Sequence, residues 1–305
     1  MGFSGKVSDY AGYALFTTTA SVVTAATLVV LKSYAYSASG SASVLASLTD
    51  STSDLGISII AFCSLHYALK PADREHRHGH GNMEGVTALF QAAFISAAAL
   101  FLGGEAFERV FNPAPVTMDM AAVAVLLLSL ILSIGLVWLQ RYTLRQAASL
   151  VVEADKAHYS SDIAINAATL IVLVLVGGLG LPAVLDSGFA LLVAFYLAFT
   201  AITIGRKALD MLLNRELPDE EREAIKTIIR EHKGVWGFHD LRTQQSGIVI
   251  FISFDIAVDP DLSLRAAHAI AKDLEAAIMK SYPRAEVLIH VDPADDTDDA
   301  RHKNF

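Results

Sequence analysis

Two aspartates stand four residues apart in SLTDSTSDLG, residues 47–56, a stretch that interrupts an otherwise apolar run. If this run is a helix, Asp50 and Asp54 face the same side, because residues at i and i+4 are neighbours on a helical surface. An ionised carboxylate inside a bilayer is costly unless it is paired, hydrated or bound to a cation. The pair therefore indicates a functional site. The alternative is that the acids line a water-filled crevice near one membrane face and make only structural hydrogen bonds.

A second polar stripe follows in EADKAHYSSDIAINAATL, where His158 and Asp162 have the same spacing of four. Two helices would then contribute three carboxylates and one imidazole. Four such ligands suit tetrahedral Zn²⁺ and also Fe²⁺, Co²⁺ or Cd²⁺, whereas Cu⁺ prefers thiolate and thioether ligands. Because histidine titrates near neutrality and metal ligands must be deprotonated, metal and protons would compete for this site.

A third cluster lies in the loop stretch PADREHRHGHGNMEG, where Asp73, His76, His78 and His80 follow one another closely. Short histidine-rich tracts often bind metal, although exposed histidines can also be polar filler. Loop spacing imposes no fixed geometry, so both interpretations stay open.

A fourth group falls in predicted β-strands near the C-terminus. In EVLIHVDP the strand period of two puts His290 and Asp292 on one face, and Asp255 lies opposite the apolar set of its own strand. With His239 on a first strand and His268 on a helix, three histidines and two aspartates could converge on a metal. The alternative is a solvated sheet face and a histidine on a helix surface.

Composition indicates that the first two stripes lie in a membrane. The chain has 305 residues, 53% of them hydrophobic, and a mean hydropathy of +0.46. Its uncharged stretches reach the roughly 20 residues that a helix needs to cross a bilayer core. The first of them has the full length of a span, so no cleavable signal peptide is expected. We predict six spans within residues 1–215, at about 10–33, 42–69, 83–111, 118–142, 152–178 and 183–209.

Positive charges set the expected orientation, because loops rich in Lys and Arg stay in the cytoplasm. They cluster before the first span and after the second, fourth and sixth, with Lys32 and Arg109 as exceptions near the other loops. Both termini are therefore expected in the cytoplasm. The residues that carry this pattern are Lys6, Lys70, Arg74, Arg77, Arg141, Arg145, Arg206, Lys207 and Arg215.

The single cysteine, Cys63, lies inside a predicted span. One cysteine provides neither a disulfide framework nor a thiolate metal cluster within one chain. We expect it to be a buried structural thiol.

A small soluble domain is predicted over residues 216–293, after the composition shifts at Arg215. Its pattern reads as a helix, two strands, a helix and a strand, the order αββαβ, which favours an α+β fold with helices on one face of a sheet. Residues 294–305 read as an acidic, disordered tail. The net charge of −9 argues against nucleic acid as a partner. The predicted elements are 218–232, 234–245, 248–258, 262–281 and 285–292.

Taken together, the aspartate pair, His-x-x-x-Asp, PADREHRHGHG and GFHDLRTQQSG resemble the cation diffusion facilitators over roughly residues 10–293. The bacterial zinc and ferrous-iron efflux members of that family are the most similar. The resemblance implies a homodimer of six-span protomers in the lipid of the bacterial inner membrane. It also implies ferredoxin-like cytoplasmic domains that meet across the two-fold axis, and export of divalent metal in exchange for protons.

The resemblance also implies roles for individual residues, with two departures from the family's pattern. This chain has Asp255 where relatives carry His, which exchanges an imidazole for a carboxylate, and Asn82 where they tend to carry Lys. His78 has no counterpart. The implied sets are a transport site of Asp50, Asp54, His158 and Asp162, a loop site of Asp73, His76 and His80, and a cytoplasmic site of His239, His268, His290 and Asp292.

The expected function is a proton-coupled antiporter that works by alternating access, with Zn²⁺ ranked first and Cd²⁺, Fe²⁺ and Co²⁺ after it. Metal at the cytoplasmic site would stabilise or regulate the dimer. One alternative is a membrane metal sensor that transports nothing. An intramembrane metal hydrolase is disfavoured, because the sequence has no His-Glu-x-x-His and four protein ligands fill a tetrahedral site.

Overall fold

The computed structural model describes residues 3–112, 120–182 and 184–295, and the chain divides into two compact units. Ala11–Leu209 form a helical unit, and Asp210–Phe305 form the second unit together with the first ten residues, Met1–Tyr10. Most of the predicted acidic tail, residues 296–305, and the first two residues of the predicted span 118–142 lie outside the described residues.

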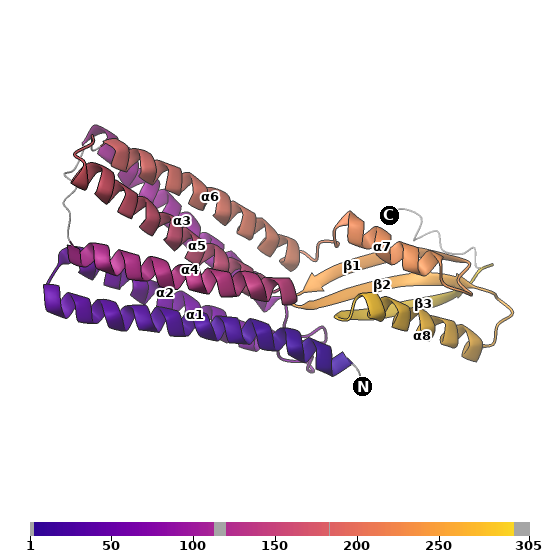
Figure 1. The fold of residues 1–305 in the computed structure, drawn as a ribbon. Coiled ribbons are helices and arrows are strands. Elements are labelled where there is room, and N and C mark those ends of the chain that lie inside the picture. The colour runs from indigo at the N-terminus through magenta and orange to yellow at the C-terminus, as the bar shows by residue number, and fades with distance from the viewer. Residues whose placement is uncertain (1–2, 113–119, 183, 296–305) are drawn as a thin grey trace. The chain divides into compact units, whose positions relative to one another are not determined.

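Six long helices build the helical unit (Figure 1). In the described residues, five of them are long and apolar enough to cross a membrane. The sixth is α2, whose apolar sequence is interrupted by Asp50 and Asp54. The helices are α1 Phe3–Ser39, α2 Ala42–Ala68, α3 Met83–Phe111, α4 Met120–Gln146, α5 Leu150–Val172, which continues as the π-helix η1 Leu173–Gly178, and α6 Val184–Leu212.

The helical unit turns apolar side chains outward and several polar ones inward. Phe101, Trp138 and Phe195 are 77%, 72% and 73% exposed, whereas Gln140 and Asp155 are fully buried. This distribution is typical of a helical bundle in lipid, where polar side chains face the bundle interior.

The start of α5 is fixed by two side chains. Ser149 is the N-cap residue, and its hydroxyl accepts a hydrogen bond from the backbone N–H of Val152. Glu84 of α3 accepts from the Ser149 hydroxyl at 2.7 Å and from the Val151 backbone N–H at 3.2 Å. A carboxylate at a helix N-terminus also meets the positive end of the helix dipole. These bonds tie α5, which carries His158, to α3.

Cys63 is exposed on α2, so the expectation of a buried thiol is wrong. The buried apolar positions on either side of it, Ile57, Ala61 and Leu65, repeat at the helical spacing of four. Cys63 is two residues from this stripe and therefore points away from the bundle interior.

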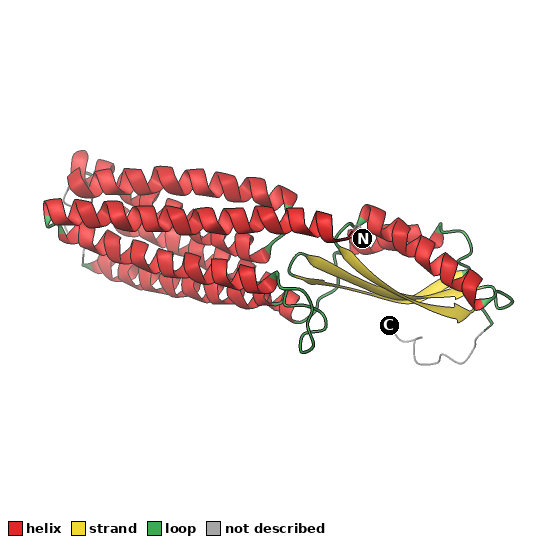
Figure 2. Ribbon diagram, turned by 90° about the horizontal axis from the view of Figure 1, so that it is seen from below, coloured by secondary structure: helices red, strands yellow, loops and turns green. Residues whose placement is uncertain are grey.

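The second unit contains a three-stranded sheet and two helices (Figure 2). The order of strands is β1-β2-β3, with β1 antiparallel and β3 parallel to β2. The predicted αββαβ order and the overall fold class, a helical membrane domain followed by a small α+β unit, are confirmed. The elements are α7 Asp219–Arg230, β1 Gly237–Ser246, β2 Val249–Val258, α8 Leu264–Ser281 and β3 Ala285–Pro293.

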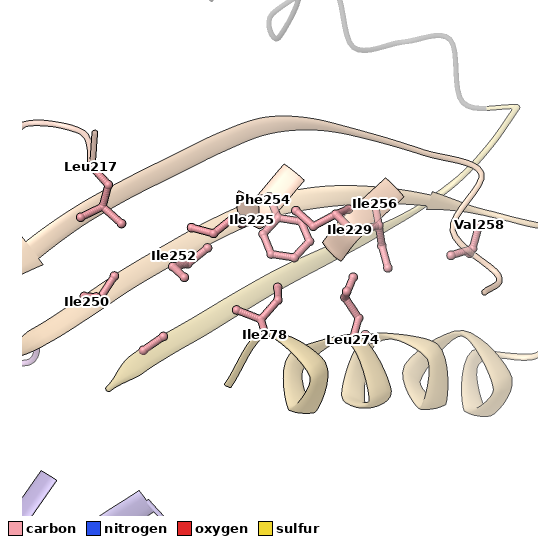
Figure 3. Close-up of a cluster of buried hydrophobic side chains, with 12 residues drawn as sticks. Leu217, Ile225, Ile229, Ile250, Ile252, Phe254, Ile256, Val258, Leu274 and Ile278 are labelled. Atoms are coloured by element: carbon pink, nitrogen blue, oxygen red, sulfur yellow. The ribbon is translucent and has the colours of Figure 1, made fainter. Parts of the chain in front are cut away.

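One face of this sheet forms the core of the unit. Alternate residues of β2, such as Ile252 and Phe254, pack against Ile229 of α7 and against Leu274 and Ile278 of α8 (Figure 3). Both helices therefore cover the same face. The alternate residues of β2 in between, Asp255 among them, lie on the opposite face and are half-buried.

Candidate metal sites

Three predicted ligands from α2 and α5 come together inside the helical unit. His158 Nε2 lies 3.1 Å from Asp54 Oδ1 and 3.8 Å from Asp162 Oδ2. Asp54 and His158 are only 7% and 4% exposed. One ligand atom from each residue lies within 4.8 Å of the others, a separation that one bound cation can bridge. Burial and mutual proximity make this group a candidate cation site in the bundle interior.

Asp50 is not part of this close group. It lies one turn before Asp54 on α2, and its side chain is exposed. Within the described residues, the helical unit thus brings together three of the four ligands predicted for the transport site.

Two aromatic rings hold the imidazole of His158 in place. The rings of Phe94 and Tyr159 lie edge-on to it, with centroids 6.0 Å and 5.5 Å away. The Tyr159 hydroxyl is in turn 2.9 Å from the Ser58 hydroxyl of α2. The imidazole of this candidate ligand is therefore oriented by neighbours that contribute no charge to the group.

The sequence interpretation assigned no role in a site to two buried ionisable residues near this group. Asp155 of α5 is fully buried and accepts hydrogen bonds from the Ser21 hydroxyl of α1 and from the Gln140 amide of α4, the latter at 2.8 Å. Lys32 of α1 is 4% exposed. Each is an ionisable residue within a predicted membrane span, and this property alone could have marked it as a candidate for a functional site.

The loop residues Asp73, His76 and His80 also converge. Asp73 lies 3.5 Å from Nδ1 of His76 and 3.4 Å from Nε2 of His80 through its two carboxylate oxygens. His80 is buried, and its Nδ1 is 3.3 Å from the carbonyl oxygen of Lys70. A contact of this kind sets the orientation of a metal-binding imidazole. His78 is not a member of this close group.

Two backbone N–H groups stabilise the ionised form of Asp73. The backbone N–H of His76 donates to its carboxylate at 2.7 Å and lowers the pKa of Asp73, and the N–H of Glu75 at 2.9 Å acts in the same direction. Because the pKa of Asp73 is lowered in the folded state, its ionised form stabilises the fold. This stabilisation is complete above the pKa of an unfolded aspartate and is lost only as the pH falls through the lowered pKa. The carboxylate is therefore ionised throughout the neutral range.

The residues predicted for the cytoplasmic site lie in one row across the sheet. His239 of β1 pairs with Asp255 of β2, and Asp255 pairs with His290 of β3. His239 Nε2 is 3.7 Å from Asp255 and 3.8 Å from Asp292, and His290 Nε2 is 3.0 Å from Asp292. The register of β1 shifts directly after His239, an irregularity of the kind that often re-aims side chains at binding sites. One imidazole and two carboxylates, those of His239, Asp255 and Asp292, thus meet on the face opposite the core, and His290 contacts this group through Asp292.

His268 does not join them within one chain. It is exposed on α8, and α8 packs against the other face of the sheet. Within the described residues, the second unit therefore brings three of the five side chains predicted for its metal site into one close group, with His290 beside Asp292 at its edge.

Two protein-family models match this chain, one over the helical part and one over the part that follows it. The family model described as "Cation efflux transmembrane domain" matches residues 18–213. The one described as "Cation efflux protein, cytoplasmic domain" matches residues 217–294. The division falls between α6 and α7.

Several cation-efflux pumps are similar to this chain along almost their whole length. FieF of Shewanella oneidensis is 43% identical over 291 residues, which cover 94% of this chain and 97% of the relative. FieF of Escherichia coli is 40% identical over 274 residues, covering 90% and 91%. A solved structure of the zinc form of CzrB is 32% identical and covers 26% of this chain and 92% of its own, with a TM-score of 0.25. The matches to both domains and to full-length relatives show that the chain belongs to the cation efflux family, the cation diffusion facilitators.

Proposed function

We propose that this protein exports divalent transition-metal ions across the bacterial inner membrane in exchange for protons. The observation that carries the proposal is the buried group of Asp54, His158 and Asp162 within a bundle of apolar helices. Buried carboxylates and an imidazole select a divalent transition metal, with Zn²⁺ first and Cd²⁺, Fe²⁺ and Co²⁺ after it. The names of the relatives, cation-efflux pumps, support the direction of transport.

Proton coupling follows from the ligand types. A metal ion binds the deprotonated forms of His158 and the two aspartates, and protons that return to these atoms displace the ion. In an alternating-access cycle the group would load metal from the cytoplasm and release it outside, where protons compete for it. An inward proton gradient would then drive metal out. In this scheme both termini lie in the cytoplasm and Asp50 completes the ligand set during the cycle.

The test is metal uptake into proteoliposomes that contain the intact protein, with an imposed pH gradient and Zn²⁺, Cd²⁺, Fe²⁺ or Mn²⁺ outside. We expect gradient-dependent flux that is fastest for Zn²⁺. Collapsing the gradient with a protonophore should remove most of that flux. An intact protein that binds metal but moves none under any gradient would instead support the membrane metal sensor.

We further propose that the protein acts as a homodimer in which metal at the cytoplasmic group stabilises the assembled state. The match to the cytoplasmic domain of cation efflux proteins and the row of ligands on one sheet face support this role. A metal that binds the assembled state more tightly shifts the equilibrium towards it, which would make the group a sensor of cytoplasmic metal.

Replacing His290 and His268 by alanine should separate regulation from transport. We expect the dependence of flux on cytoplasmic metal to flatten, with transport itself retained, because the group inside the helical unit is untouched. His232→Ala is the matched control, since His232 pairs with Asp273 at 3.3 Å and belongs to no metal-binding group. Activity equal to that of the unchanged protein at every metal concentration would reject the regulatory role.

A further inference from the structure

Lys32 is a buried cation that the metal chemistry described so far does not use. It lies on α1, its side chain is 4% exposed, and among the described residues it is the only lysine or arginine that is buried. A charged side chain inside a membrane bundle is costly and is retained where a partner or a function compensates for it. Its surroundings therefore indicate what it does.

The ammonium group reaches the helix that carries the aspartate pair. Lys32 Nζ donates to the hydroxyl of Ser51 at 2.6 Å and to the backbone carbonyl of Ser47 at 3.2 Å, both on α2. Ser51 directly follows Asp50 and precedes Asp54 by three residues. Both acceptors are uncharged, so the two hydrogen bonds position the ammonium but do not neutralise it.

The charges that act on this ammonium are those of the candidate transport site. Asp50 directly precedes Ser51, the hydrogen-bond partner of Lys32, and Asp54 follows Ser51 by about one helical turn. Both carboxylates and that of Asp162 on α5 attract the ammonium. When a bound metal ion has displaced their protons, the three carboxylates and the ammonium carry a net charge of −2, which one divalent cation cancels. Without the ammonium, a divalent ion would leave an excess negative charge in a buried site, where unbalanced charge is expensive.

From this arrangement we propose that Lys32 is a resident counter-cation of the transport site. It offsets part of the negative charge when the site is empty and repels the metal when the site is filled. The repulsion weakens binding enough for the ion to leave, because a transported ion must be bound firmly enough to enter and loosely enough to depart. The inference rests on the proposed transport function and assigns to Lys32 the setting of metal affinity.

The test compares Lys32→Gln, which keeps a hydrogen-bond donor and removes the charge, with Lys32→Arg, which keeps the charge. Initial rates of Zn²⁺ uptake into proteoliposomes, measured against Zn²⁺ concentration, give KM and kcat for each. We expect Lys32→Gln to lower KM on the order of tenfold and to lower kcat as well, because a fixed positive charge no longer opposes binding and no longer favours release of the divalent ion. Lys32→Arg should stay close to the unchanged protein.

Equilibrium dialysis of Zn²⁺ supplies a second readout that does not depend on flux. The relevant quantity is the difference in bound Zn²⁺ between each protein and the same protein carrying Asp54→Ala as well. Zn²⁺ bound at the loop group or at the group in the second unit is equal in both and cancels. The Zn²⁺ whose binding depends on Asp54 should bind more tightly in Lys32→Gln than in the unchanged protein. Lys207→Gln is the control, because Lys207 is an exposed lysine of the helical unit that pairs with Glu153 at 2.6 Å.

Each outcome decides the matter. Weaker binding together with slower transport in Lys32→Gln, not restored by Lys32→Arg, would mean that the side chain only holds α1 against α2, and the inference would be rejected. Unchanged KM and kcat would also reject it. Absence of Zn²⁺ flux in the unchanged protein would instead overturn the proposed function, whereas dialysis would still report on the charge of Lys32.

Discussion

Asp54→Asn is expected to reduce the initial rate of Zn²⁺ uptake by at least about 100-fold, more than the loss typical of a residue that only supports a metal ligand. The substitution preserves the size of the side chain and removes its negative charge. Asp54 lies 3.1 Å from His158 in a buried environment, so no water replaces the missing ligand easily. The measurement is the gradient-driven uptake of Zn²⁺ into proteoliposomes, normalised to the amount of incorporated protein.

The same substitution at Asp186 provides the control for Asp54→Asn. Asp186 is also a carboxylate of the helical unit, but it pairs with Arg109 at 3.1 Å and belongs to no metal-binding group. A partly exposed ion pair contributes about 1 kcal/mol or less, so Asp186→Asn should transport nearly as well as the unchanged protein. Similar rates for the two variants would show that the buried group does not carry the metal.

Phe254→Ala is expected to destabilise the second unit by about 3–5 kcal/mol, the range for removing a buried aromatic side chain. Phe254 is 2% exposed and lies in the middle of the core between the sheet and both helices. Whole domains have stabilities of only about 5–15 kcal/mol, so the loss is a large fraction of the total. Pulse proteolysis of the full-length protein in increasing urea would measure the change in unfolding midpoint.

Loss of this core should also weaken metal binding on the opposite face. Asp255 follows Phe254 directly, and its contact with His239 depends on the pairing of β1 with β2. Packing of the sheet against its two helices maintains that pairing. Phe251→Ala is the matched control, since Phe251 lies on the same strand but on the other face and is half-buried. We expect a cost of about 1 kcal/mol there. Equal costs for the two variants would contradict the assignment of the core face.

Hydrophobic length and strand alternation predicted the fold class well, because both are local properties of the chain. The alternation in IVIFISFDIAV predicted that Phe254 and Asp255 face opposite sides of a sheet, and the structure has this arrangement. The first strand was predicted from residue 234 but begins at Gly237. Gly234 adopts a positive φ of 90°, so it belongs to the turn that precedes the strand.

The candidate site was less predictable, because spacing on one helix does not say which side chain meets the neighbouring helix. The i, i+4 rule paired Asp50 with Asp54, yet only Asp54 lies in the close group with His158. The same limitation applies to His268, whose helix packs on the face away from the other ligands. Lys32 was counted as an exception to the charge pattern, and its contact with Ser51 depends on how α1 packs against α2.

Cys63 makes the helix that carries Asp54 accessible to spectroscopy without further mutation. It is the only cysteine of the chain and points away from the bundle interior, so a membrane-permeant thiol-reactive spin label or fluorophore would attach at one defined position without disturbing the packed interior. The position lies nine residues after Asp54, about 13.5 Å along the helix axis at 1.5 Å per residue. In a dimer the two labels would form a single distance pair, whose distribution with and without Zn²⁺ would report movement of α2 during the transport cycle.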